Sequence, residues 1–250
     1  MECSDRAYVH ISAGTTRIGN AWIERSWSAF LGRAVGLTDR TLARDWLNAS
    51  GDDFLLICSD RRITPMDLGE KEWSEAMFSL GASLTVRHAG PGIVFDVCTR
   101  VFHRASFMMR SCRIMNASNQ DMSMDEVVID QMQLSARAPE YDVFLMEHGG
   151  CAGYLLDGSR GLAFAALSGA EAAFAPSESG TTFRCATPAL QIAPGAHCEL
   201  PDTGVAFFSG DRADGMSAAE MIADQIRKWR VHEAEQRAAA RAEEAAQNGG

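Results

Sequence analysis

The chain has 250 residues, of which 46% are hydrophobic and 22% charged, a composition typical of a folded globular protein rather than a disordered one. Its 23 Lys and Arg residues against 33 Asp and Glu residues give a net charge of −10. This balance argues against a nucleic-acid partner, because neutralising phosphates requires a basic surplus. The longest apolar runs, 54–58 and 162–167, are far shorter than a membrane span, so we expect no membrane partner.

Short strands punctuated by glycine and proline are predicted from about residue 7 to 209. The strongest lies at 93–104, where Ile93, Phe95 and Val97 alternate with polar or smaller residues, a two-residue period that sorts side chains onto opposite faces of a sheet. The others are predicted at 8–12, 21–30, 53–58, 76–80, 83–88, 107–116, 126–134, 143–147, 161–168, 171–175, 181–185, 189–193 and 204–208. Because no amphipathic helix separates them, we expect an antiparallel sandwich or barrel.

Beyond residue 210 the sequence changes to helix-forming residues. Ile222, Ile226 and Trp229 lie at i, i+4 and i+7 and make one apolar stripe. Asp214 or Ser217 could cap the start of this helix. Past residue 231 alanine and charged residues dominate, which predicts a solvated helix or a frayed tail.

The cysteines and the N-terminus bear on the compartment. The seven cysteines, at positions 3, 58, 98, 112, 151, 185 and 198, form no Cys-x-x-Cys pair, which argues against a zinc or thioredoxin-type site. The first residues lack the basic and apolar segments of a secretory signal, so we expect a cytoplasmic protein with reduced thiols.

The sequence contains none of four local motifs that mark particular enzyme reactions or cofactor sites. The sequence has no phosphate-binding GxxxxGK[ST], no GxGxxG after a strand, no HExxH and no GxSxG. We therefore assign no catalytic residue, no metal ligand and no cofactor. Glu147 and His148 end a predicted strand and could exchange a proton, or could be an exposed strand end.

Five residues are candidates for binding a substrate. Trp46 and Trp73 lie among polar residues, and an exposed indole can stack on a sugar ring; Asp45 directly precedes Trp46. Arg100 and His103 belong to the predicted strand 93–104. A guanidinium can hold hydroxyls or carboxylates, whereas His103 could line a sugar cleft or be a hydrogen-bonded core residue.

Arg100, Arg110 and Arg113 fall on neighbouring predicted strands and could converge on one sheet face. The alternative is a solvated face on which they pair with nearby aspartates. Those aspartates are Asp96, Asp125 and Asp130.

Three stretches in a shared order resemble the N-terminal β-supersandwich domain of alpha-galactosidase-like (melibiase-type) glycoside hydrolases, which has the galactose-mutarotase-like fold. The first is 18–27 (IGNAWIERSW), followed by TD at 38–39 and RDW at 44–46. The second lies within 91–130 and includes 111–119 (SCRIMNASN) and 127–130 (VVID). The third is 153–163 (GYLLDGSRGLA), followed by 190–201 (LQIAPGAHCELP).

The resemblance covers roughly residues 8–230 and implies a β-supersandwich domain at 1–210, with a linker-like helix and mobile tail at 211–250. In that family a (β/α)₈ barrel, about 200 further residues, carries the two catalytic aspartates. No residue here therefore inherits a catalytic role, and we expect no enzymatic activity from this chain on its own. The resemblance implies a non-catalytic sugar-contact or assembly domain of a glycoside hydrolase system. Its expected partners are a carbohydrate and either a catalytic barrel or further copies of itself.

Two alternatives stay open. The same sheet architecture occurs in aldose mutarotases, which use a histidine and a glutamate on the concave face, so the chain could be an aldose-1-epimerase-like enzyme, although no mutarotase-like Asn/His signature is found. It could also be a purely structural oligomerisation module that uses the C-terminal helix as its contact.

Overall fold

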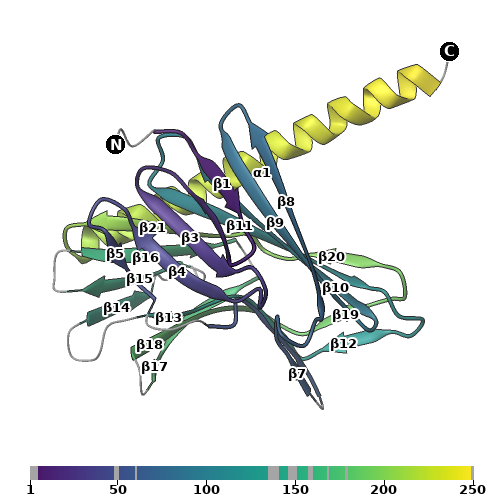
Figure 1. The fold of residues 1–250 in the computed structure, drawn as a ribbon, viewed down its shortest axis with the longest axis horizontal. Coiled ribbons are helices and arrows are strands. Elements are labelled where there is room, and N and C mark those ends of the chain that lie inside the picture. Colours follow the sequence, from purple (N-terminus) through teal and green to yellow (C-terminus); the bar gives the residue numbers. More distant parts are fainter. Residues whose placement is uncertain are drawn as a thin grey trace.

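The computed structural model describes residues 5–47, 51–59, 61–134, 141–145, 151–156, 160–167, 169–177 and 180–248. These residues form layered antiparallel β-sheets with a long helix along one side (Figure 1). The prediction of a mainly β, antiparallel supersandwich with a C-terminal helix is confirmed. Glu147 and His148 lie outside the described residues.

The largest sheet has nine strands in the order β14-β15-β16-β21-β11-β10-β9-β8, with β20 also paired to β11. In chain order they are β8 (Glu70–Phe78), β9 (Gly81–Gly90), β10 (Ile93–Phe102), β11 (Phe107–Asn116), β14 (Tyr141–Leu145), β15 (Cys151–Leu156), β16 (Arg160–Ala166), β20 (His197–Glu199) and β21 (Thr203–Ser209). Thr99 pairs with Arg110 and Arg100 with Met109, so Arg100 and Arg110 point to opposite faces.

Three smaller sheets complete the fold. The N-terminal sheet runs β1 (Tyr8–Ile11), β2 (Thr15–Gly19), β3 (Ile23–Ser28), β4 (Ala34–Asp39) and β5 (Arg44–Asp45). The second five-stranded sheet has the order β17-β18-β13-β6-β7, built from β6 (Leu55–Cys58), β7 (Arg61–Ile63), β13 (Glu126–Leu134), β17 (Glu171–Ser177) and β18 (Gly180–Thr187). A two-stranded ribbon joins β12 (Met122–Met124) to β19 (Leu190–Ile192).

Alternating apolar runs predicted their strands well, and short polar strands were missed. The predicted strand 126–134 coincides with β13, and 107–116 with β11. The predicted strand 76–80 is wrong at its end, because β8 stops at Phe78 and the chain turns before β9. Strands such as β7 carry a single buried residue, Ile63, which leaves no alternation for a pattern to detect.

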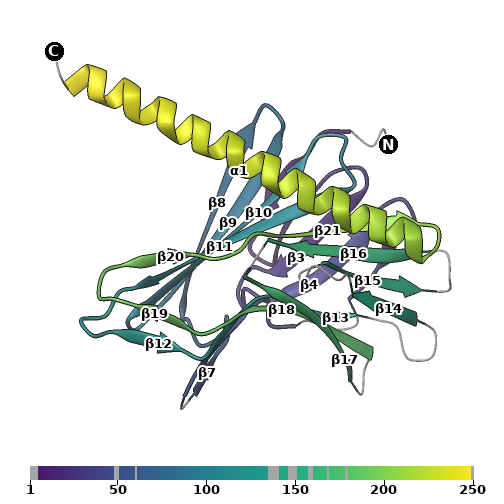
Figure 2. The ribbon, with the colours of Figure 1, turned by 180° about the vertical axis from the view of Figure 1, so that it is seen from behind.

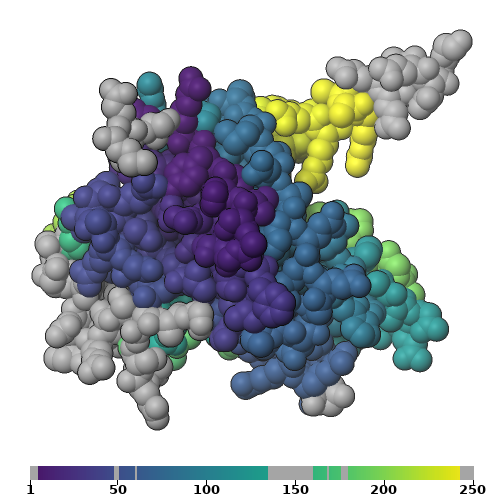
Figure 3. All heavy atoms as spheres, viewed as in Figure 1, coloured from purple at the N-terminus to yellow at the C-terminus, as the bar shows by residue number. Residues whose placement is uncertain are grey.

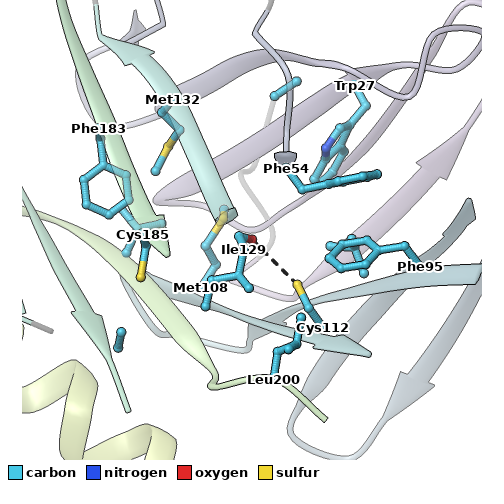
Figure 4. Close-up of a cluster of buried hydrophobic side chains, with 14 of the residues drawn as sticks. Trp27, Phe54, Phe95, Met108, Cys112, Ile129, Met132, Phe183, Cys185 and Leu200 are labelled. Atoms are coloured by element: carbon cyan, nitrogen blue, oxygen red, sulfur yellow. Dashed lines mark hydrogen bonds between the residues drawn. The ribbon is translucent and has the colours of Figure 1, made fainter. Parts of the chain in front are cut away.

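The main core lies where the sheets face one another. Figure 4 shows Trp27, Phe54 and Phe95 on one side of it and Met132 and Phe183 on the other. The thiol of Cys112 donates to the carbonyl of Ile129 at 3.6 Å, and burial raises its pKa to about 12, so it behaves as a small apolar side chain. In the described part of the chain Cys98, Cys112, Cys185 and Cys198 are free thiols.

The helix α1 (Arg212–Asn248) crosses the outer side of the large sheet, over β21, β16 and β15 (Figure 2). Its N-terminal cap is Asp211, whose carboxylate accepts from the amides of Ala213 and Asp214. The carboxylate of Asp214 in turn accepts from the amide of Asp211 at 2.9 Å. The expectation that Asp214 or Ser217 is the cap is therefore wrong by one turn. No helix in the described residues is long and apolar enough to cross a membrane.

The predicted stripe docks α1. Ile222 and Ile226 are fully buried against Met109, Ala163 and Ala206 of the large sheet. From Ala234 to Ala242 the side chains are exposed, and the helix extends beyond the body of the protein past the β8–β9 hairpin (Figure 3). The division into a domain at 1–210 and a mobile tail at 211–250 stays a prediction.

Candidate functional site

The five predicted binding residues lie in three separate places. Asp45 ends β5 and Trp46 follows it, Trp73 lies on the edge strand β8, and Arg100 lies near the end of β10, with His103 just after that strand. The chain therefore does not gather them into one site.

Trp46 was expected at the surface, and this is wrong. Its side chain is 1% exposed and stacks on Phe207, with ring centroids 5.7 Å apart, while the Arg44 guanidinium lies 5.0 Å from its centroid. The indole points inward although its neighbours are polar. Asp45 is exposed, but its carboxylate accepts from the amides of Leu37 and Leu47, both at 3.0 Å, and so fixes the backbone.

Trp73 is half-buried. Its indole N–H donates to the carbonyl of Ala29 at 3.3 Å, and its ring packs against Trp27 with centroids 6.2 Å apart. These contacts tie the edge of the large sheet to the N-terminal sheet. Binding of a substrate by Trp73 stays a prediction.

The three arginines do not converge. Arg113 pairs with Asp96 at 2.7 Å on a partly exposed face, as the alternative expected. Arg110 instead points into the core, where it pairs with Asp130 and with Asp53. Arg100 lies on the outer face under α1, where it donates to Ser111 and to Glu233, each at 2.7 Å.

A buried ion cluster, Arg25, Asp53, Arg110 and Asp130, joins the three main sheets. Arg25 contacts Asp53 at 2.6 Å and Asp130 at 2.9 Å; Arg110 contacts Asp53 at 2.7 Å and also binds Asp130. Burial alone would raise the pKa of Asp53, but Arg110 and Arg25 outweigh it and hold that pKa below its ordinary value. The two positive and two negative side chains neutralise one another, so the cluster is suited to holding the sheets together rather than to binding a ligand.

One pocket that includes a predicted residue, His103, lies between α1 and the large sheet. This helix pocket has a volume of about 370 Å³. Its lining residues are Leu80, Phe102, His103, Ala105, Phe107, Gln225, Lys228, Trp229 and His232. Its lining combines aromatic and aliphatic groups with nitrogen-bearing side chains, the combination expected of a small-ligand site.

Trp229 lines the helix pocket and is contacted by several side chains. Its ring lies 5.3 Å from that of Phe102 and 5.4 Å from that of Phe78, and the Arg100 guanidinium lies 5.5 Å from its centroid. The indole N–H is buried without a hydrogen-bond partner. Arg100 thus acts on the pocket indirectly, because it fixes Trp229 and, through Glu233, the helix.

His103 lines the pocket in a fixed orientation. Its Nδ1 accepts from the amide of Ala7 at 2.9 Å. His103 is therefore hydrogen-bonded, as one expectation had it, and also lines a pocket, as the other had it. The sequence missed Gln225, Lys228 and His232. The helical spacing of Gln225, Lys228, Trp229 and His232 on one side of α1 was the signal available.

A wider groove of about 790 Å³ lies over β17, β18 and β13 but is less suited to a ring-shaped ligand. Its lining holds Asp125, Glu126, Glu171 and Arg184 without an aromatic side chain, and Arg184 already pairs with Glu126 at 2.5 Å. Among the residues that the structure describes, no three His, Cys, Asp or Glu side chains come together as a metal site would require.

Comparison with known proteins assigns the fold. No family model matches the sequence, and no curated protein matches it. Among solved structures, the alpha-N-acetylgalactosaminidase NagBb from Bifidobacterium bifidum superposes with a TM-score of 0.63 at 8% identity, over 88% of this chain and 39% of that one. The galactosidase domain of the alpha-galactosidase-sucrose kinase AgaSK gives 0.61 at 9% identity, over 81% of this chain and 42% of that one.

A third neighbour matches over nearly its whole length. It is a protein from Klebsiella pneumoniae assigned as an aldose 1-epimerase, with a TM-score of 0.53 at 8% identity, over 84% of this chain and 83% of that one. The fold is thus a galactose-mutarotase-like β-sandwich, as the resemblance predicted. The chain spans less than half the length of the two glycosidases, and identities this low define the fold alone.

Proposed function

We propose that this chain is a non-catalytic carbohydrate-contact domain of an alpha-galactosidase-like glycoside hydrolase system, and that the helix pocket is where it contacts the sugar. The fold that it shares with glycosidases supports the connection to sugars. The observation that carries the proposal is the helix pocket itself, in which Trp229 and Phe102 offer apolar ring faces beside hydrogen-bonding groups.

The lining of the helix pocket also favours binding over hydrolysis. Glycosidic cleavage uses two carboxyl groups held a defined distance apart across the bond. The described lining residues of the helix pocket include neither Asp nor Glu. Asp53 and Asp130, buried in the core, are both engaged by arginines.

Saturation-transfer NMR with methyl α-galactoside, run beside an aryl α-galactoside hydrolysis assay, tests this proposal. We expect saccharide contact that Trp229→Ala abolishes, and no turnover. Turnover by the pure protein that is lost on mutating one carboxylate in residues 1–210 would contradict the non-catalytic role. Absence of saccharide binding, with the protein folded, would favour the purely structural oligomerisation module.

An aldose-1-epimerase-like enzyme is the second candidate. The observation in its favour is the match over 83% of the Klebsiella protein, compared with 39% and 42% of the glycosidase chains. Interconversion of anomers needs a proton donor and a proton acceptor at the ring. Polarimetry of freshly dissolved α-galactose separates the two candidates: we expect the buffer rate, and a faster rate that saturates with galactose would favour the epimerase.

A further inference from the structure

Nitrogen-bearing side chains form the polar part of the helix pocket, and the Gln225 amide adds one oxygen acceptor beside its NH₂ donor. Gln225, Lys228 and His232 project from α1, and His103 follows β10. The side chain of Lys228 is 66% exposed and contacts Asp224 at 2.7 Å, an exposed pair one turn away. Such pairs contribute little, so the ammonium can turn toward a bound ligand at small cost.

The hydrogen bonds of the two histidines fix which nitrogen carries the ring hydrogen. His103 accepts through Nδ1 from the amide of Ala7, which places its hydrogen on Nε2. Nε2 of His232 lies 2.9 Å from the amide nitrogen of Gln236, which donates, and this contact favours the tautomer of His232 with its hydrogen on Nδ1. Each imidazole is therefore left with one N–H to offer.

Within the described lining this donor-rich group has no acceptor charge of its own; the carboxylate that contacts Lys228, Asp224, lies outside the lining. None of the described lining residues is a carboxylate, whereas Lys228 carries a positive charge and both imidazoles retain an N–H. Neutral sugars need acceptors for their hydroxyl hydrogens as well as donors. A ligand that complements these donors supplies hydrogen-bond acceptors itself, preferably charged ones.

We propose that the helix pocket selects an acidic monosaccharide, a single pyranose ring that carries a carboxylate or a phosphate, over a neutral hexose. The inference rests on the proposed carbohydrate-contact function and names the substrate class. The ring face lies against Trp229 and Phe102, and the anionic group lies at Lys228 and the imidazole N–H groups. A volume of about 370 Å³ suits one ring. Because the net charge is −10, the selectivity is local and owes nothing to long-range attraction.

Calorimetric titration of the full chain with galactose, galacturonate, galactose 6-phosphate and inorganic phosphate tests the inference. We expect at least one of the two acidic sugars to bind about tenfold more tightly than galactose, and inorganic phosphate to bind more weakly than galactose 6-phosphate because it lacks the ring. The preferred acidic sugar then identifies the anionic group. Equal affinity for galactose and for both acidic sugars would overturn the inference but leave carbohydrate contact standing. Absence of binding by every sugar would overturn both.

Two neighbouring substitutions separate the local effect from net charge. Lys228→Gln removes the positive charge at the pocket, and Arg227→Gln removes one from an exposed residue of the same helix that is not part of the lining. We expect Lys228→Gln to weaken the acidic sugar about tenfold and galactose much less, and Arg227→Gln to change neither. A loss of the same size in both variants, or no loss in Lys228→Gln, would contradict the assignment.

Discussion

His88 is 1% exposed, next to the buried ion cluster, with its ring edge-on to Phe54 at 4.9 Å. Burial lowers its pKa from 6.5 to about 4; Lys71 and Arg110 act in the same direction, and Asp53 and Asp96 oppose them. Between these two pH values His88 is therefore protonated in the unfolded chain and neutral in the folded chain. Stability falls as the pH drops through this window, by roughly 3 kcal/mol over its full width.

Urea unfolding at pH 7 and pH 4.5 of the wild type and of His88→Gln measures this contribution. We expect the acid-induced loss of unfolding free energy to be smaller in the variant by roughly 2–3 kcal/mol. The comparison uses the difference between the two pH values, so a constant cost of the substitution cancels. Equal acid losses in both proteins would contradict the assignment.

The buried ion cluster predicts strong coupling between its members. Arg110→Met leaves Asp53 and Asp130 with Arg25 alone, so we expect a loss of about 3–5 kcal/mol in unfolding free energy. Adding Asp130→Asn restores the charge balance, because Arg25 and Asp53 remain. Denaturant unfolding of both single variants and the double variant measures this coupling. The double variant should lose much less unfolding free energy than the two single losses added together, and simple additivity would contradict the cluster.

Gly204 on β21 controls the docking of α1. A Cβ at this position would lie 2.4 Å from Cγ2 of Ile222 and 3.4 Å from Cδ1 of Ile226. We therefore expect Gly204→Ala to push the helix off the sheet and to cost about 1–3 kcal/mol. The control is Gly69→Ala, whose Cβ meets nothing within 4 Å. Thermal unfolding should separate the two, and equal melting temperatures would contradict this packing.

The two halves of α1 should differ in their contribution to stability. The side chains from Ala234 to Ala242 are exposed, so ordering them is not offset by apolar burial, whereas Trp229 packs on Phe78 and Phe102. We expect deletion of residues 235–250 to leave the melting temperature nearly unchanged and Trp229→Ala to lower it. A truncation as destabilising as the tryptophan change would show that the tail is a packed element.

Sequence patterns predicted features that lie within one element and missed those made by two. The stripe of Ile222, Ile226 and Trp229 is periodic within one helix, so its docking could be foreseen. Lys228 and His232 line the same pocket as His103 only because the fold brings α1 to the end of β10, and no local pattern encodes that arrangement. Trp46 was misplaced because polar neighbours on a two-residue strand say nothing about where the next side chain points.

At the scale of the whole molecule, the described residues form layered β-sheets with a helix laid across the outside, and the helix pocket lies between the helix and the large sheet. The buried ion cluster in the core pairs its own charges, while the outside presents aromatic rings and N–H groups beside α1. This distribution supports the proposal that a ligand is contacted on the helix side, while the interior serves stability. Catalysis in a larger glycoside hydrolase system would then come from another domain.

The five tryptophans of the chain provide the most direct test. Each indole N–H gives one signal in a ¹H–¹⁵N correlation spectrum, and Trp229→Phe identifies the signal of Trp229. On titration with galactose and galacturonate, we predict a saturable shift of the Trp229 signal, with the signals of Trp46 and Trp73 unmoved. A saturable shift at Trp73 or Trp46 without one at Trp229, or no shift at any tryptophan, would contradict a carbohydrate-contact site at the helix pocket.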